Sequence, residues 1–144
     1  MKYKVCVGIL REITVEAITP DEIEDKVNEL LKPGEIIQKY ERINNGIAIH
    51  TPTLDGFNNI LGKLKSIGWE LRDLKENEKT EKYWNEHKEK TCICFMERSH
   101  WQRKQSLVCC NIDSLLDLYI DIVSVEEYDK ILEYDNKTRK KLNK

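Results

Sequence analysis

The order of strand-like and helix-like segments in the first half of the chain constrains the fold most strongly. Apolar and polar residues alternate over residues 3–18, which predicts one long strand with a bend near Gly8 or a bulge at residues 10–12. Thr19-Pro20-Asp21-Glu22 then places a capping threonine before a proline. This pattern predicts a helix, which Pro33-Gly34 ends.

A hairpin and a second helix follow. The runs 36–43 and 47–50 flank Asn44-Asn45-Gly46, and Asn-Gly favours a two-residue hairpin turn because both residues tolerate positive φ. An apolar stripe at helical spacing extends from Leu54 to Gly68, after which a strand begins. Residues 3–76 therefore read strand, helix, strand, strand, helix, strand, the order of a ferredoxin-like βαββαβ antiparallel sheet. The predicted fold class is α+β.

The second half adds an extra strand and a C-terminal helical hairpin to this core. A polar helix at 78–89 precedes a strand at 91–98 that is apolar on both faces. A helix is predicted over 112–123, and the capping box Ser124-Val125-Glu126-Glu127 opens the last helix, whose basic end from Asn136 is expected to fray. We predict a single domain, 1–144. It consists of a ferredoxin-like core (1–76), a helix, strand and basic-aromatic segment (77–110) and a helical hairpin (111–144).

Composition narrows the functional class. The formal net charge of −2 and the pI near 6.0 disfavour bulk attraction to nucleic acid or to an acidic membrane. The apolar runs are too short for a membrane span, and the five cysteines are an odd number without a secretory signal, so we expect a cytoplasmic protein with reduced thiols. The richness in lysine, isoleucine and asparagine suggests an AT-rich genome, such as that of a low-GC bacterium or its phages.

Aromatic and cationic side chains are concentrated in one stretch of the chain. Guanidinium groups bind phosphate oxygens in a forked geometry, and tryptophan or tyrosine rings stack on nucleotide bases. The candidate ligand-binding residues are Arg98, His100, Trp101, Arg103, Lys104, Tyr83 and Trp84. The alternative is an exposed turn with solvated cations and a tryptophan that packs on the core.

Metal binding and catalysis have weaker candidates. The pairs Cys92/Cys94 and Cys109/Cys110, with His87 and His100, could ligate zinc, but their spacing differs from that of structural zinc sites, and reduced cysteines are often small core residues. Asp113, Asp117 and Asp121 would form one ridge of the predicted helix, which could bind a divalent ion but more often is a solvated face. Ser99 has only the adjacent His100, without a third orienting group. We therefore expect neither an enzyme nor a metal or other cofactor.

Three stretches resemble small phage anti-defence proteins that sequester nucleotide signals, in particular the anti-Thoeris sponges that capture cyclic ADP-ribose isomers. These stretches are MKYKVCVGILREITVEA, ERSHWQRKQ and LLDLYIDIVSVEEYDKIL. The resemblance implies a non-catalytic oligomer with ligand pockets between protomers.

The leading hypothesis is therefore non-catalytic binding and sequestration of a small phosphorylated, nucleotide-like signal. The alternative is a protein-interaction regulator of phage or bacterial origin that acts through its helical surface. Binding to single-stranded nucleic acid is a third hypothesis, which the net negative charge disfavours. The long first strand and the apolar circumference of the predicted helix 112–123 also predict a homo-oligomer, unless the last helix covers that surface within a monomer.

Overall fold

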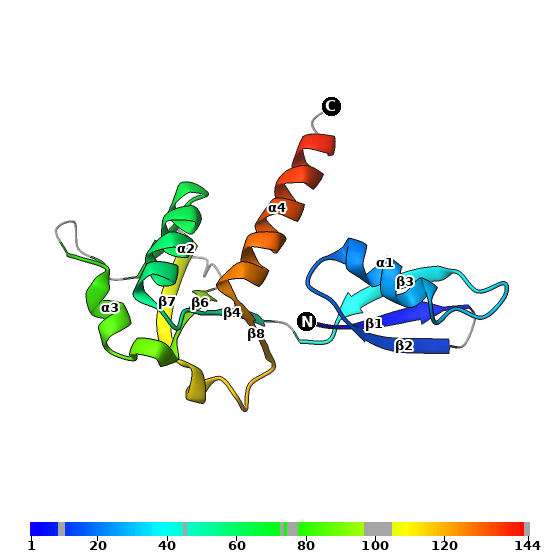
Figure 1. The fold of residues 1–144 in the computed structure, drawn as a ribbon, viewed down its shortest axis with the longest axis horizontal. Coiled ribbons are helices and arrows are strands. Elements are labelled where there is room, and N and C mark those ends of the chain that lie inside the picture. The colour runs from blue at the N-terminus through cyan, green and yellow to red at the C-terminus, as the bar shows by residue number, and fades with distance from the viewer. Residues whose placement is uncertain (9–10, 45, 73, 75–77, 97–104, 143–144) are drawn as a thin grey trace. The chain divides into compact units, whose positions relative to one another are not determined.

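The computed structural model describes residues 1–8, 11–44, 46–72, 74, 78–96 and 105–142 (Figure 1). The described chain forms two compact units. Unit 1 consists of residues 1–45 and 126–144, and unit 2 consists of residues 46–125. The divisions predicted after residues 76 and 110 both fall inside unit 2.

Unit 1 is a three-stranded antiparallel sheet with a helix packed on it. The strands are β1 (Lys2–Val7), β2 (Arg11–Glu16) and β3 (Ile37–Arg42), in the order β2-β1-β3. Helix α1 (Pro20–Asn28) buries Ile23 and Val27 in a common core with the sheet, and α4 (Val125–Leu142) contributes nearly all of its length to this unit. The residues of the sheet in this core are Tyr3, Val5, Val7 and Val15, and Ala17, which follows β2, joins them.

The single long strand predicted over residues 3–18 is wrong. The chain reverses after Val7, and β1 and β2 form a hairpin in which Lys2 pairs with Glu16 and Val7 with Arg11. Gly8 has a φ of 61°, a left-handed conformation that glycine adopts without strain and that permits the reversal. In both strands the apolar residues stand at odd-numbered positions. The alternation therefore continues unbroken across the turn and gives no sign of it in the sequence.

Unit 2 is a five-stranded sheet in which one central strand runs against the other four. Its strands are β4 (Gly46–His50), β5 (Trp69–Leu71), β6 (Thr91–Met96), β7 (Gln105–Asn111) and β8 (Ile120–Ser124), in the order β5-β7-β6-β4-β8. β6 is antiparallel to β4 and β7, whereas β4 with β8 and β5 with β7 are parallel pairs. Helix α2 (Leu54–Ser66) supplies the buried residues Phe57, Ile60 and Leu64. Helix α3 (Glu81–Asn85) and two short 3-10 turns, η1 (Lys88–Lys90) and η2 (Ile112–Ser114), complete the unit.

The α+β class is confirmed, but the ferredoxin-like topology is not, because its four strands are divided between two sheets. The hairpin predicted at Asn44-Asn45-Gly46 is wrong for the same reason: β3 belongs to the sheet of unit 1, and β4 belongs to that of unit 2. The helices predicted after Thr19-Pro20, before Gly68 and after Ser124 are confirmed as α1, α2 and α4. The strand predicted over 91–98 is confirmed as β6, and the polar helix at 78–89 is present as the shorter α3 followed by η1.

The helix predicted over 112–123, and with it the helical hairpin, is wrong. Residues 112–114 form η2, and Ile120–Ser124 form β8. The run Ile120-Asp121-Ile122-Val123 is rich in β-branched residues and lies parallel to β4, with which it pairs residue by residue. The two segments on which the homo-oligomer prediction depended are therefore different elements, although Leu116, Leu118 and Tyr119 remain exposed. Within the described residues, the structure contains no helix long and apolar enough to cross a membrane.

Candidate functional site

The candidate functional site is a cleft of about 500 Å³ in unit 1, referred to below as the α1–β3 cleft. Its residues come from the first turns of α1, from β3 and from α4. They are Pro20, Asp21, Ile23, Glu24, Ile37, Tyr40 and Tyr134. A cleft of this volume lies in the range of ligand-binding pockets.

The position of Tyr40 follows from the register of the sheet. Tyr40 pairs with Val5, so its side chain lies on the α1 face of the sheet, where its ring meets the ring of Tyr3 edge to face at 6.1 Å. α1 packs mainly against β2, and Tyr40 is 45% exposed. The cleft is therefore the part of this face that α1 does not cover.

β3 also offers main-chain groups to the cleft. It is an edge strand, since β1 is its only partner among the described strands. The N–H of Ile43 donates to the carbonyl of Lys2 at 3.0 Å, and bonding alternates along an antiparallel ladder. The N–H and C=O of Tyr40 therefore point away from β1, toward the open edge.

The charge of the cleft is negative. Among the described residues, its lining contains two carboxylates, Asp21 and Glu24, and no lysine or arginine. A smaller adjoining depression of about 190 Å³ shares Asp21 and Tyr134 with the cleft. It adds the carboxylates of Glu22 and Glu133 and the ammonium groups of Lys130 and Lys137. Together the two depressions hold four carboxylates against two lysines, so the surface favours a cationic ligand.

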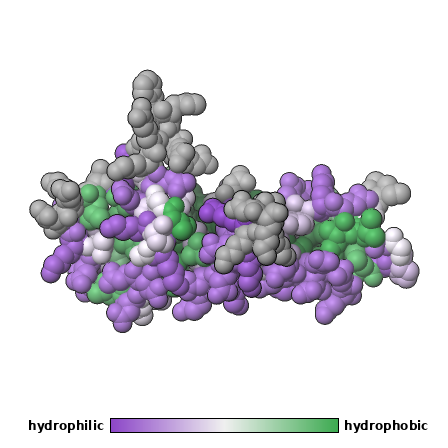
Figure 2. All heavy atoms as spheres, turned by 90° about the horizontal axis from the view of Figure 1, so that it is seen from above, coloured by the Kyte–Doolittle hydropathy of each residue, from purple (hydrophilic) through white to green (hydrophobic). Residues whose placement is uncertain are grey.

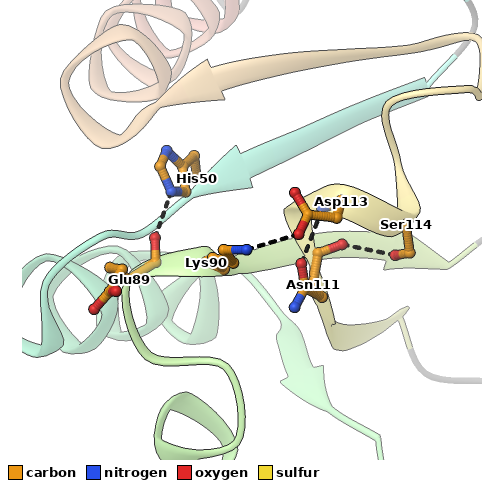
Figure 3. Close-up of polar contacts among 6 residues, drawn as sticks. All are labelled: His50, Glu89, Lys90, Asn111, Asp113 and Ser114. Carbon is orange, nitrogen blue, oxygen red and sulfur yellow. Dashed lines mark hydrogen bonds and ion pairs between the residues drawn. The ribbon is translucent and has the colours of Figure 1, made fainter.

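A second group of polar residues lies in unit 2, where β4 and β7 end and β6 begins (Figure 3). The His50 Nε2 donates to the carbonyl of Glu89 at 2.7 Å, and Lys90 forms an ion pair with Asp113 at 2.8 Å. Asn111 accepts a hydrogen bond from the N–H of Asp113 and caps η2. The hydrogen bond to Asp113 raises the pKa of the Lys90 ammonium. These contacts join β4 to η1, η1 to η2 and β7 to η2, so their role is to hold this end of the sheet together.

Trp84, a predicted ligand-binding residue, is part of a buried hydrogen-bond network at the same end of the sheet. Its indole N–H donates to the carbonyl of Thr51 at 3.0 Å, and its own carbonyl accepts from the hydroxyl of Thr91 at 3.1 Å. Thr51 and Thr91 are fully buried, and the hydroxyl of Thr51 donates to the carbonyl of Thr91 at 3.0 Å. Trp84 thus attaches α3 to β4 and β6. Tyr83 is the neighbouring half-buried residue, with the Lys82 Nζ 5.2 Å from its ring.

The other predicted binding residues, Arg98, His100, Trp101, Arg103 and Lys104, lie outside the described residues. The described ends of that segment are Met96 and Gln105, which lie at the opposite end of β6 and β7 from Thr91. Five residue steps along β6 correspond to about 17 Å. Trp84 is therefore attached at one end of the sheet, and the basic segment is attached at the other.

Three of the predicted metal ligands share one face of the sheet in unit 2. Cys92 pairs directly with Cys110, and Cys94 lies two residues along β6 on the same face. They pack with Ala48 and Leu115. Cys109 pairs with Ile93 on the other face, where burial raises its pKa to about 12. Within the described part of the chain, no three histidine, cysteine or acidic side chains are arranged to hold a metal ion.

The acidic ridge predicted from Asp113, Asp117 and Asp121 is not formed, because it required the helix over 112–123. Asp113 lies in η2 and pairs with Lys90, whereas Asp121 lies on β8. The three carboxylates therefore do not share a helix face.

Sequence reasoning missed the α1–β3 cleft. Its residues come from separate stretches of the chain and include no motif. The one local signal is an aromatic residue, Tyr40, in the otherwise polar run Gln38–Arg42.

Comparison of the chain with protein-family models, curated proteins and solved structures gives no match. The functional conclusion therefore depends on the residues themselves.

Proposed function

We propose that the protein is a non-catalytic interaction module that binds an extended, basic polypeptide segment in the α1–β3 cleft. The observation that supports this function is the combination of an edge strand with an acidic, tyrosine-lined cleft beside it. An extended peptide can add to the edge of a sheet through main-chain hydrogen bonds while pockets beside the edge select alternate side chains. β3 supplies the edge, and the cleft supplies the pocket.

The chemistry of the cleft defines the partner. Lysine or arginine side chains would pair with Asp21 and Glu24, and the tyrosine rings offer faces for cation–π contact. The half-buried Ile37 accommodates the aliphatic stem of such a residue or a neighbouring apolar side chain. The preferred partner is therefore a strand in which cationic and apolar residues alternate.

The strand also carries features that restrict pairing. Lys39 lies on the polar face of β3, and the register shifts by a bulge between Cys6 and Val7 opposite the start of β3. Charged residues and bulges on edge strands suppress indiscriminate pairing. They leave the segment from Lys39 to Arg42 as the regular part of the edge, so a partner would pair there, next to Tyr40.

Fluorescence anisotropy with three labelled peptides tests the proposal. The first alternates lysine with aromatic residues, the second replaces each lysine by glutamate, and the third is the lysine peptide N-methylated at alternate residues. We expect binding of the first peptide alone, weakened by salt. Equal binding of the lysine and glutamate peptides would refute the charge argument, and undiminished binding of the methylated peptide would refute strand addition. Failure of all three to bind would refute the proposed function.

Matched variants locate the site. The double variant Asp21→Asn, Glu24→Gln should weaken binding by roughly 2- to 30-fold, since an exposed ion pair contributes about 0.2–1 kcal/mol. Glu41→Gln is the control, because Glu41 pairs with Lys4 on the opposite face of the sheet. Glu22 is left unchanged in all variants, since its carboxylate accepts from the N–H of Ile18 at 2.8 Å and supports the start of α1.

Sequestration of a nucleotide-like signal is a second candidate function, which one observation in unit 2 favours. The rings of Trp69 and Phe95 meet at 4.8 Å, and the Arg72 guanidinium contacts the Met96 sulfur at 3.7 Å, at the end of the sheet where residues 97–104 are attached. Two aromatic rings and a cationic side chain thus lie at this end of the sheet. Incubation with cyclic and ADP-ribose-derived nucleotides followed by heat denaturation tests this function. Release of intact nucleotide supports sequestration, released product indicates an enzyme, and no retention excludes both.

A further inference from the structure

The two carboxylates of the α1–β3 cleft are placed to accept hydrogen bonds from a single ligand group. Asp21 and Glu24 are three residues apart on α1, so they are neighbours on the helix surface, with about 5–6 Å between their Cβ atoms. Both side chains are exposed, and neither forms a hydrogen bond or an ion pair with another residue that the structure describes. Glu22, by contrast, accepts from the N–H of Ile18 at 2.8 Å. The carboxylates of Asp21 and Glu24 are therefore available to a ligand.

The ring of Tyr40 adds an aromatic surface to the same cleft. It meets the ring of Tyr3 edge to face, with 6.1 Å between the ring centroids and 74° between the planes. Tyr3 is 7% exposed and belongs to the core, so this contact restricts the orientation of the Tyr40 ring. Tyr40 itself is 45% exposed, and Tyr134 brings a second ring to the cleft from α4. The cleft thus offers oriented aromatic surface together with two carboxylates.

The cations of unit 1 that lie nearby do not occupy the cleft. Arg42 is on the same face of β3, but its Nε donates to the carbonyl of Asn44 at 2.8 Å and its Nη1 contacts the sulfur of Met1 at 3.5 Å. Within the described part of the chain, Lys130 and Lys137 of the adjoining depression form no ion pair with the cleft carboxylates. The positive charge that the cleft favours is therefore left for a ligand to supply.

We propose that the α1–β3 cleft selects the guanidinium group of arginine over the ammonium group of lysine. The inference rests on the proposed function, because it names the side chain that the bound peptide places in the cleft. A guanidinium is planar and has five N–H donors in a fixed fork, so it can stack on an aromatic ring while it donates to both carboxylates. An ammonium group is compact and more strongly hydrated, and it has no plane to lay on a ring.

The edge of β3 determines which residue of the peptide enters the cleft. The outward N–H and C=O of Tyr40 would pair with one residue of an antiparallel partner strand. The side chain of that residue lies on the same face of the sheet as the Tyr40 ring, since directly opposite residues share a face. Its neighbours along the strand point to the other face, where Lys39 and Glu41 lie. The selected arginine is thus the residue opposite Tyr40.

Fluorescence anisotropy of the wild-type protein with one series of labelled peptides tests the inference. The peptides share an alternating sequence of aromatic and uncharged polar residues around a single central position. That position is lysine, homoarginine, arginine, trimethyllysine or citrulline. Homoarginine keeps the stem of lysine and changes only the head group, whereas citrulline keeps the shape of arginine without its charge. We expect the arginine and homoarginine peptides to bind roughly 5- to 50-fold more tightly than the lysine peptide, and the citrulline peptide to bind more weakly than either.

Matched tyrosine variants locate the preference. Tyr40→Leu should bind the arginine and lysine peptides with equal affinity, whereas Tyr40→Phe, which keeps the aromatic face, should retain the preference. Tyr119→Leu is the control, because Tyr119 is 83% exposed and belongs to unit 2. Circular dichroism establishes that each variant is folded, and the wild-type series decides even if Tyr40→Leu is not.

The outcomes separate this inference from the proposed function. Equal binding of the arginine and lysine peptides would overturn the inference and leave the proposed function intact. Tighter binding of the trimethyllysine peptide than of the arginine peptide would also overturn it, because the cleft would then select a bulky ammonium and not a planar group. An undiminished preference in folded Tyr40→Leu would contradict the stacking on which the selection depends. Failure of every peptide to bind would instead refute the proposed function itself.

Discussion

Replacing Trp84 by phenylalanine separates a structural role from a ligand-binding role for this residue. The indole N–H donates to the Thr51 carbonyl at 3.0 Å, and phenylalanine keeps a ring but has no donor. Thr51 is fully buried, so its carbonyl would lose the indole partner in a place that water reaches poorly. We therefore expect α3 and the adjoining ends of β4 and β6 to loosen.

The magnitude follows from the acceptor that is left behind. A buried polar group without its hydrogen-bond partner costs about 1–3 kcal/mol, more than the net value of an average hydrogen bond. The second contact between the same elements, from the Thr91 hydroxyl to the Trp84 carbonyl, is retained in the variant. A destabilisation of about 1–3 kcal/mol corresponds to roughly 5- to 150-fold more frequent opening of this region.

Amide hydrogen exchange read on peptides that cover residues 78–96 measures this opening without reference to unit 1. The control is Asn85→Ala, an exposed position on the same helix. Exchange in the Trp84→Phe variant that is as slow as in Asn85→Ala would refute the structural account. If nucleotide retention were then lost in Trp84→Phe, the indole would belong to a binding site.

Three further predictions concern stability. Gly62→Ala in α2 should stabilise the protein by about 0.5–1 kcal/mol, because nothing lies near the added methyl group. Gly68→Ala, just after α2, should destabilise it by about 1–2 kcal/mol, because Gly68 has a φ of 102°. Urea denaturation measures both changes in the free energy of unfolding. Leu115→Ala should cost about 2–3 kcal/mol and Leu116→Ala less than about 0.5 kcal/mol in the same assay, because Leu115 is buried and Leu116 is 66% exposed. Burial raises the pKa of the Cys92 and Cys109 thiols from 9.0 to about 12, so both favour the folded state below pH 9 and lose this contribution as the pH rises toward 12. The free energy of unfolding should fall over this range by up to about 1.4 kcal/mol per pH unit for each thiol, and less steeply in Cys109→Ala.

Local signals predicted the starts of α1, α2 and α4, because these signals lie within a few residues of each helix start. Thr53 accepts from the Gly56 N–H at 3.1 Å and caps α2. Pro20 begins α1 as predicted, but the Thr19 side chain makes no capping hydrogen bond there. At Gly68 the chain leaves α2 in a left-handed conformation, as expected of a glycine after a helix. These features depend on neighbours within a few residues, which is why a single sequence is sufficient to predict them.

Pairing of strands could not be predicted in the same way. Alternation indicates that residues 3–16 and 37–50 are extended, but it does not state which strands share a sheet. β4 pairs with β6 and β8, more than forty and seventy residues away, rather than with β3 beside it in the chain. The Asn-Gly dipeptide favours a hairpin locally, but here the preference for sheet partners with apolar faces decides the outcome, because Ala48 and Ile49 are fully buried in unit 2.

Short apolar runs are also ambiguous between helix and strand. Residues 115–123 have apolar side chains both at helical spacing and at alternate positions. In a run this short, the hydrophobic pattern does not distinguish a buried strand from a buried helix. The structure resolves the ambiguity by packing Leu115, Ile120 and Ile122 on the cysteine face of the sheet. A helix over the same residues would have turned Ile120 and Ile122 about 200° apart and could not have directed both to that face.

The residues of the cleft come from separate elements of the fold, whereas those of the predicted basic-aromatic segment are neighbours in the chain. The sequence search favoured residues that are close in the chain, and it found a segment in which cations and rings are neighbours. In the α1–β3 cleft Asp21 lies in the first turn of α1, where the helix dipole favours negative charge, and Glu24 lies in the next turn. Tyr40 lies on β3, where an aromatic side chain is favoured. Each residue thus satisfies a local structural preference, and no position stands out as unusual by itself. The surface shows the same dispersion, because hydrophobic atoms form separate patches among hydrophilic ones (Figure 2). The sheet order makes β3 an edge strand, and α1 leaves Tyr40 partly exposed. These residues form a candidate site because of this arrangement, which the sequence does not reveal.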